Sequence, residues 1–357
     1  MNNDWRAFLS NSGAVFDGDI VKDFGNPQRE QQASVGGTVI TDLSHLGVIR
    51  AQGDDAATFL QGQLTNDIKQ VDENHSQLSG YCNPQGRLLA VFQIFTYKGD
   101  YYLLLPATLT QETLERLRKF ILMSRVTLDD VSNDLVRIGV YGKQAGPRLQ
   151  SVLDTRLPDS EQNATSFGDF TLLYIPGHTS RYLVCGPADK MQDLWNKLDV
   201  HAAAVGAYNW GWQDIQAGLP VVYPETIGSF IPQMVNLDLL GAINFKKGCY
   251  TGQEIVARLH YRGKLKRRMY LADIPRGETS PQAGDILYDD RLTDEGKAIG
   301  HIVRCQPSPS GTVSLLAEIT IEQARSGLKD GHIHWQSPEG PVLTPIPLPY
   351  VIPDEET

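Results

Sequence analysis

The strongest constraint on the fold is a change in the pattern of the chain near residue 268. Residues 37–268 mix helical and extended patterns without the regular alternation of a parallel βαβ protein. The residues that follow form only short strand candidates, broken by Gly, Pro, Asp and Ser, which is typical of a small antiparallel barrel or sandwich. The sequence therefore predicts an α+β core over residues 37–268 and a small antiparallel β-barrel over residues 269–352.

The two ends of the chain lie outside these regions. Residues 1–36 are polar and mixed in character, so we expect a loosely packed N-terminal lead-in. Residues 353–357 are predicted to form a frayed tail. The N-terminus lacks a basic start followed by an apolar run, and no apolar stretch approaches the roughly 20 residues that span a membrane. We therefore expect neither a signal peptide nor a membrane contact.

Several segments have patterns that predict particular elements. In the core, we expect helices over residues 54–67, from residue 110, after Pro187 and over residues 206–216, and a hairpin over residues 88–105. In the C-terminal region, strands are expected over residues 269–274, 285–288, 298–305, 313–319 and 332–335.

Charge and cysteine content exclude several classes of protein. The formal net charge is -10, which argues against a protein that coats nucleic acid or an anionic membrane with its whole surface. The four cysteines contain no C-x-x-C pair and are too sparse for a disulfide scaffold, so a reducing cytoplasm is expected. The sequence also lacks a P-loop, a G-x-S-x-G and an H-E-x-x-H motif, which removes the commonest nucleotide enzymes and hydrolases.

One cysteine lies in a distinctive setting. Thr251 and Glu254 have the spacing of a capping box, which predicts a helix that begins at Thr251. Cys249 comes two residues earlier, after two lysines, and a helix N-terminus and nearby positive charge both favour a thiolate. Cys249 is therefore a candidate nucleophile, redox sensor or metal ligand. The alternative is a small, inert residue buried in a turn.

Positive charge is concentrated around this cysteine. Residues 245–268 contain eight Lys and Arg residues but only one acid, Glu254, for a local charge of +7. Such segregation indicates an anion site for a polyglutamate tail, a phosphate or an RNA backbone. The alternative is a solvated face whose cations pair with acids elsewhere in the fold, and Arg258 has the spacing of a helical ion pair with Glu254.

Three other groups of residues are weaker candidates. Asn66 and Asp67 either present polar groups to a ligand or simply end a helix. Residues 81–86 either contribute to a site or form a plain β-turn. His332 and His334 alternate along a predicted strand, but two histidines without a third ligand make a poor metal site, so surface histidines are expected.

The residues around Cys249 resemble a known family. Lys247–Glu254 reads Lys-Gly-Cys-Tyr-Thr-Gly-Gln-Glu, which resembles the K-G-C-Y-x-G-Q-E signature of the YgfZ-type folate-binding proteins, and residues 258 and 261–263 extend the match. The resemblance covers roughly residues 40–350. Further support comes from segments shared with the broader glycine-cleavage T-protein family, at residues 59–67, 86–87 and 296–300.

The resemblance implies a fold, a ligand and a role. It implies a folate-binding α+β core of two intertwined subdomains with a C-terminal β-barrel around a central channel. It also implies binding of tetrahydrofolate or another reduced folate, and support of iron–sulfur enzymes or assembly proteins, including enzymes that thiolate tRNA. Cys249 would act near the folate, by ligating an iron or a transient iron–sulfur cluster or by reversible oxidation. The implied folate-binding residues are Asn66, Asp67, Tyr81, Lys247, Tyr250, Gln253, Glu254, Arg258 and Arg262.

One departure from the T-protein pattern bears on activity. T-protein aminomethyltransferases carry a Gly-Gly-x-x-Asp-Asp run, whereas residues 85–90 here read Gln-Gly-Arg-Leu-Leu-Ala. Both acids are replaced by apolar residues, which disfavours aminomethyl transfer and leaves folate binding in place. A folate-dependent one-carbon transferase or demethylase therefore stays as an alternative. A second alternative is a tRNA-binding module that uses Arg262, Lys264, Lys266, Arg267 and Arg268.

Overall fold

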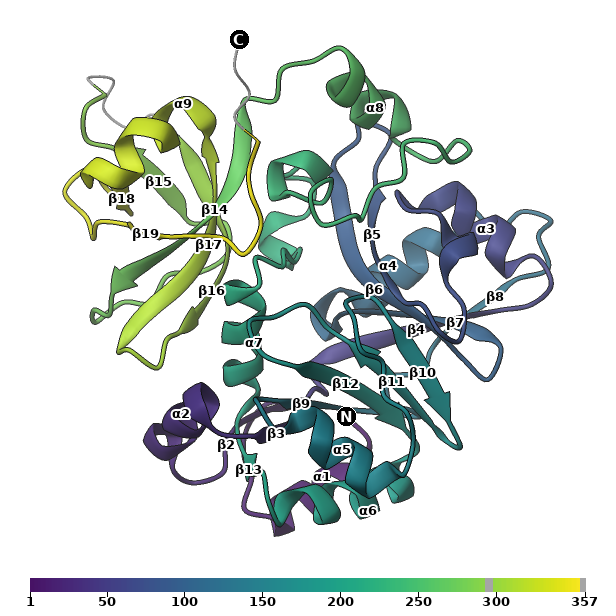
Figure 1. Cartoon of the computed structure of the whole chain (residues 1–357). Coiled ribbons are helices and arrows are strands. Elements are labelled where there is room, and N and C mark those ends of the chain that lie inside the picture. Colours follow the sequence, from purple (N-terminus) through teal and green to yellow (C-terminus); the bar gives the residue numbers. More distant parts are fainter. Residues whose placement is uncertain (293–297, 354–357) are drawn as a thin grey trace. The chain divides into compact units, whose positions relative to one another are not determined.

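The computed structural model describes residues 1–292 and 298–353, and Figure 1 shows its helices and strands. The chain divides into two compact units. The chain passes between the units five times, so neither unit is one continuous segment. The domain boundary near residue 268 stays a prediction, and the motif at residues 296–300 and the tail at residues 353–357 lie partly outside the described residues. The first unit contains Met1–Gln63, Asp67–Ser79 and Phe92–Gly211, and the second contains Leu64–Asn66, Gly80–Val91 and Trp212–Thr357.

A six-stranded sheet lies within the first unit. Its order is β10-β11-β12-β9-β3-β13, and all neighbours are antiparallel except the short β13 beside β3. Three helices bury apolar side chains in the core beside this sheet, and α6 begins after Pro187 as predicted. The strands are β3 (Val39–Asp42), β9 (Val136–Tyr141), β10 (Ala164–Phe167), β11 (Phe170–Tyr174), β12 (Arg181–Gly186) and β13 (Ala203–Ala204), and the helices are α1 (Asn3–Asn11), α5 (Ala145–Leu153) and α6 (Ala188–Asp199).

The first 36 residues are packed into this core, and the expectation of a loosely packed lead-in is wrong. Trp5 and Leu9 of α1 are fully buried, and Trp5 donates a hydrogen bond to Asp42 (Nε1 to Oδ1, 2.7 Å). The Trp5 ring also meets the edge of Trp195. Overall polarity concealed the narrow apolar stripe that anchors α1. The rest of this region is β1 (Val15–Asp17), β2 (Ile20–Asp23) and α2 (Pro27–Gly36).

A five-stranded sheet in the order β5-β6-β7-β4-β8 passes through both units, because β5 and β6 each cross from one to the other. The predicted hairpin is confirmed as β6 and β7, with Lys98 and Gly99 at positive φ in the turn. The helix predicted over residues 54–67 is confirmed as α3, but it ends at Gln63 because Leu64 pairs with Tyr81 instead. The elements are β4 (Leu46–Gln52), β5 (Gln77–Cys82), β6 (Leu88–Tyr97), β7 (Asp100–Pro106), β8 (Thr127–Asp130), α3 (Ala56–Gln63), η1 (Ile68–Gln70) and α4 (Ala107–Arg118).

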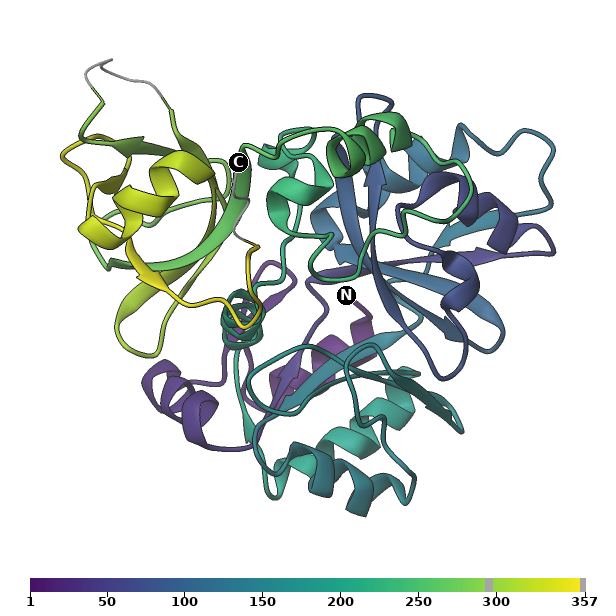
Figure 2. The same cartoon turned by 45° about the horizontal axis from the view of Figure 1, so that its top comes forward.

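The second unit contains a curled antiparallel sheet that forms a half-barrel (Figure 2). All five strands predicted for this region are present, and β19 is an additional strand. The core of this sheet is made of aliphatic side chains and Trp335. Its order is β18 (Ile333–Trp335), β15 (Ile286–Asp289), β16 (Gly300–Pro307), β17 (Thr312–Thr320), β14 (Arg267–Pro275) and β19 (Thr344–Ile346).

Helical segments precede this half-barrel along the chain or connect two of its strands. Helix α7 is confirmed where it was predicted, and it begins in the first unit and ends in the second. No helix in the described part of the chain is long and apolar enough to cross a membrane. The segments are α7 (Ala207–Gln216), η2 (Pro224–Thr226), η3 (Pro232–Val235), α8 (Gln253–Tyr261), α9 (Ile321–Gln323) and η4 (Ala324–Leu328).

Candidate functional site

The segment around Cys249 is a loop, residues 244–252, that is tied to a distant part of the second unit. Its first residue, Asn244, donates its backbone N–H to the carbonyl of Thr65 (3.0 Å). Just upstream, Thr65 Oγ1 donates to the carbonyl of Ala242 (2.7 Å), and Asn66 Nδ2 donates to the carbonyl of Gly241 (2.8 Å). Residues 64–66 therefore act as an anchor for the loop, and the amide of Asn66 is part of that anchor.

Lys247 secures the middle of the same loop. Its Nζ donates to the carbonyls of Leu64 (2.6 Å) and Asn66 (2.9 Å) and lies 5.1 Å from the ring centroid of Tyr250. Charge-assisted hydrogen bonds of this kind are among the stronger polar contacts in proteins. In this structure the Lys247 ammonium holds the loop in place by donating hydrogen bonds to two backbone carbonyls.

Cys249 differs sharply in exposure from Tyr250, the residue that follows it. Tyr250 is 7% exposed, and burial raises its pKa. Cys82 lies near enough to Tyr250 for their charges to interact, and burial raises the pKa of that thiol to about 12. Cys249 itself is exposed, whereas Cys82 and Cys185 are buried and Cys305 is partly buried. The alternative that Cys249 is buried in a turn is therefore wrong, whereas the reactivity of its thiol stays a prediction.

Two glycines bring the end of this loop against the turn between β5 and β6. Gly86 and Gly252 both have positive φ, +71° and +85°. A Cβ atom added to Gly252 would lie 2.5 Å from the carbonyl oxygen of Asn83 and 2.9 Å from Cα of Gly86. The two backbones can approach this closely because neither position carries a side chain. Tyr81 and Cys82 end strand β5, and residues 83–86 form the turn that the end of the cysteine loop contacts.

The predicted capping box is absent, and this expectation is wrong. Helix α8 begins at Gln253, two residues after Thr251, and its N-cap is Gly252, which has no side chain to cap the helix. The left-handed backbone of Gly252 turns the chain at this point, so Thr251 lies outside the helix. Val256 is the fully buried residue of α8, and its carbonyl accepts a hydrogen bond from Gln233 Nε2 (2.7 Å).

The cations of the basic segment separate into two groups. Arg267 forms an ion pair with Glu318 (2.9 Å), and the buried Arg268 forms one with Asp238 (2.7 Å). For these two residues, pairing with acids elsewhere in the fold is confirmed. The exposed cations are Lys246, Arg258, Arg262, Lys264 and Lys266, and no carboxylate of the described residues lies within 4.0 Å of any of them. Arg258 accordingly makes no such pair with Glu254.

The remaining predicted site residues have varied surroundings. Tyr81 is buried within β5, Gln253 is half-buried at the start of α8, and Glu254 is exposed. Asp67 belongs to the first unit, where its Oδ1 accepts hydrogen bonds from Gln61 Nε2 (2.9 Å) and from the N–H of Lys69 (3.2 Å). Asp67 therefore caps the start of the short helix η1, whereas the structural alternative considered for it was the end of the preceding helix.

Sequence reasoning missed two buried amides in the first unit. Gln63 ends α3 and Gln77 begins β5, and both side chains are at least nine-tenths buried. Gln63 Oε1 and Gln77 Nε2 have no hydrogen-bond partner. An acceptor and a donor left unpaired at this depth are costly unless a ligand or water satisfies them. The available signal was a glutamine at the end of an otherwise apolar helical face.

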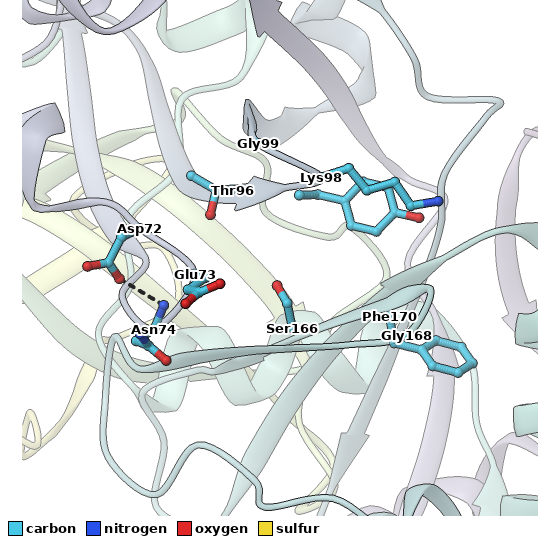
Figure 3. Close-up of a pocket in the computed structure, with 10 residues that line it drawn as sticks. Asp72, Glu73, Asn74, Thr96, Lys98, Gly99, Ser166, Gly168 and Phe170 are labelled. Atoms are coloured by element: carbon cyan, nitrogen blue, oxygen red, sulfur yellow. Dashed lines mark hydrogen bonds between the residues drawn. The ribbon is translucent and has the colours of Figure 1, made fainter.

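A separate hollow of about 520 Å³ lies in the first unit (Figure 3). Figure 3 shows Asp72, Glu73 and Asn74 on one side of it and Ser166 and Lys98 on others. None of the predicted site residues lines it. Elsewhere, His332 and His334 both contact the carboxylate of Asp290 (2.8 and 3.3 Å). Within residues 1–292 and 298–353, no group of three or more His, Cys, Asp or Glu side chains is arranged to hold a metal ion.

Comparison with known proteins identifies the family to which this chain belongs. The family model of the GCVT N-terminal domain matches residues 18–215. A relative from Edwardsiella ictaluri, named tRNA-modifying protein YgfZ, is 33% identical over 86% of this chain and 91% of its own length. This chain belongs to the YgfZ family. Another protein of that name, from Colwellia psychrerythraea, is 29% identical over 78% of this chain and 85% of its own length.

The fold of this YgfZ-family chain is also seen in a solved structure. The glycine cleavage system aminomethyltransferase T of Bartonella henselae superposes with a TM-score of 0.76 over 97% of this chain and 96% of that one, at 18% identity. At that identity the match establishes the fold alone. The predicted T-protein-like α+β architecture is thus confirmed, and the small antiparallel β-barrel predicted at the C-terminal end takes the form of a curled half-barrel.

Proposed function

We propose that this chain is a folate-binding accessory protein that supports iron–sulfur enzymes, including those that thiolate tRNA, through the thiol of Cys249. The observation that carries the proposal is the setting of that thiol. Lys247 is hydrogen-bonded on one side and Tyr250 is buried on the other, while Cys249 between them is exposed. A fixed backbone on both sides presents the thiol to a partner in a defined position. The relatives named tRNA-modifying protein YgfZ support the link to tRNA.

The chemistry proposed for Cys249 is metal ligation. A thiolate is a ligand for iron, but a single cysteine cannot hold a cluster. In the part of the chain described by the structure, no cluster of ligands surrounds it. The other ligands would therefore come from a client protein, which makes the contact transient.

The donor groups available to a reduced folate fit its chemistry. In the first unit, the unpaired amide oxygen of Gln63 and amide nitrogen of Gln77 suit a polar heterocycle that both donates and accepts hydrogen bonds. Within this unit, the two amides would bind and orient the heterocycle of a bound folate.

Turnover of the folate is the weaker alternative. The positions that match the acid pair of the T-protein are Leu89 and Ala90, in β6. Leu89 is partly buried and Ala90 is fully buried, and neither can accept or deliver a proton. The proposal is therefore an accessory role, without catalysis on the folate.

The test uses two serine variants in cells that lack the native protein. We expect Cys249→Ser to fail to restore the thiolated tRNA made by an iron–sulfur enzyme. Cys305→Ser, at a partly buried cysteine of the half-barrel, should restore it. Full rescue by Cys249→Ser would contradict the thiolate role. An anaerobic calorimetric titration of the purified protein with tetrahydrofolate tests the folate separately, and saturable micromolar binding is expected.

A further inference from the structure

A cluster of three aromatic rings lies at the surface beside the cysteine loop. Phe245, in the loop, and His260, near the end of α8, are stacked with centroids 3.7 Å apart and planes 9° apart. Tyr261 meets both rings edge-on, at centroid distances of 6.2 and 4.7 Å. His260 is exposed and Tyr261 is 63% exposed, so the cluster has ring surface open to solvent. Because these rings are open to solvent, the cluster is not part of a hydrophobic core.

Unpaired positive charge surrounds these rings in the sequence. The five exposed cations identified above flank the cluster along the loop, along α8 and along the segment that follows it. The chain as a whole is strongly acidic, so this concentration is local. We call the three rings and these five cations the cationic aromatic face, which consists of Phe245, His260, Tyr261, Lys246, Arg258, Arg262, Lys264 and Lys266.

The combination of rings and cations discriminates between classes of partner. An acidic peptide or an anionic lipid surface would satisfy the cations but would leave the rings without a matching group. A fully paired RNA duplex would offer phosphates, but its bases are already stacked on one another. Unpaired nucleotides offer both a phosphate for each cation and a base that stacks on an aromatic ring.

We propose that the cationic aromatic face binds the unpaired nucleotides of a tRNA loop, with Tyr261 stacking on a base. The inference rests on the proposed function for the choice of tRNA among RNAs. It adds a direct contact to that function. Phe245 and Cys249 belong to one anchored loop and are four residues apart, so their Cα atoms are at most about 14 Å apart. RNA bound at this face would therefore lie close to the exposed thiol.

The test measures binding of RNA to the full-length protein by fluorescence anisotropy. The probes are a labelled 17-nucleotide tRNA anticodon stem–loop and a fully paired duplex of the same length. We expect the stem–loop to bind more tightly. Tyr261→Ala should weaken its binding by on the order of 5- to 150-fold, the effect of losing one stacked base. Tyr261→Phe keeps the ring and should retain binding.

Salt dependence tests the charges. The Lys264→Gln/Lys266→Gln double variant should reduce the slope of log K against log salt by about 1.4, because each phosphate contact of a single strand contributes about 0.7. The matched control is Arg276→Gln/Lys329→Gln, which removes the same charge from exposed positions elsewhere in the second unit and should leave the slope unchanged. Urea unfolding of each variant confirms that it is folded.

Two results would overturn the inference. One is stem–loop binding that Tyr261→Ala leaves intact. The other is competition by polyglutamate that matches that of unlabelled RNA, which would identify a surface for acidic proteins. Tetrahydrofolate titration of the wild-type protein separates this inference from the proposed function. Absence of folate binding would count against the proposed function, while the RNA result would stand by itself.

Discussion

Substitution of Gly252 by alanine would test how the cysteine loop is held. Gly252 has a φ of +85°, and an added Cβ would lie 2.5 Å from the carbonyl oxygen of Asn83. The nearest atoms belong to the backbone of the β5–β6 turn, so none can move aside by rotating a side chain. To reach an ordinary contact of 3.4 Å, the two backbones must separate by roughly 0.9 Å.

The free-energy cost of the Gly252→Ala substitution has two parts. Alanine in the left-handed region is disfavoured by about 1–2 kcal/mol, and forcing apart closely packed atoms costs about 1–3 kcal/mol. The chain can relieve both by detaching the loop from the turn. A total of about 2–5 kcal/mol would raise the population of the detached form by about 30- to 5,000-fold.

Alkylation of cysteines in the native protein measures this population. Cys82 directly precedes the turn and is 1% exposed, so its labelling by iodoacetamide should accelerate strongly in Gly252→Ala. Cys249 is exposed in either state and provides an internal reference. The matched control is Gly248→Ala, in the same loop, where an added Cβ meets nothing within 4 Å. Equal Cys82 labelling in Gly252→Ala and wild type would refute the reasoning.

Three further predictions follow from the same structure. Lys247→Met should lower the free energy of unfolding by about 1.5–3 kcal/mol in urea titrations, because two carbonyls lose a charged donor, whereas Lys246→Met should change it little. Iodoacetamide at pH 8.5 should label Cys249 first in peptide mass spectra, since burial raises the pKa of each of the other three thiols to about 12; faster labelling of Cys185 would contradict this. Hydrogen bonds from Arg291 lower the pKa of the Asp289 carboxyl group. The ionised pair therefore stabilises the folded state above about pH 4, and this stabilisation is lost as the pH falls through the folded-state pKa of Asp289. Arg291→Gln should therefore destabilise the protein at pH 7, and the difference from wild type in urea midpoints should shrink towards pH 3 rather than stay constant.

Much of the fold could be predicted because its elements have strong local signals. The β6–β7 hairpin, helix α6 and the strands of the half-barrel all follow from apolar periodicity and turn residues. The ends of elements depend on distant partners instead. Helix α3 ends early because Leu64 pairs with Tyr81, and α1 is buried because Trp5 finds Asp42. Neither partner is visible in local sequence.

The motif singled out the segment around Cys249, and its role as a site stays a prediction. Charge counting, however, could not show that Arg268 is buried against Asp238 while Lys264 is exposed. The capping box was predicted wrongly because Gly252 has a left-handed backbone and packs against a turn more than 160 residues earlier in the chain.

The anchor of the cysteine loop also sets an order of events during synthesis. The Lys247 ammonium and the Leu64 carbonyl that it binds are 183 residues apart in the chain. At translation rates of about 5–20 residues per second, residues 64–66 leave the ribosome about 9 to 37 s before the lysine that pairs with them. Until then these carbonyls cannot accept the hydrogen bonds of Lys247. The cysteine loop can therefore be anchored only after the whole of the first unit, which ends at Gly211, has been synthesised.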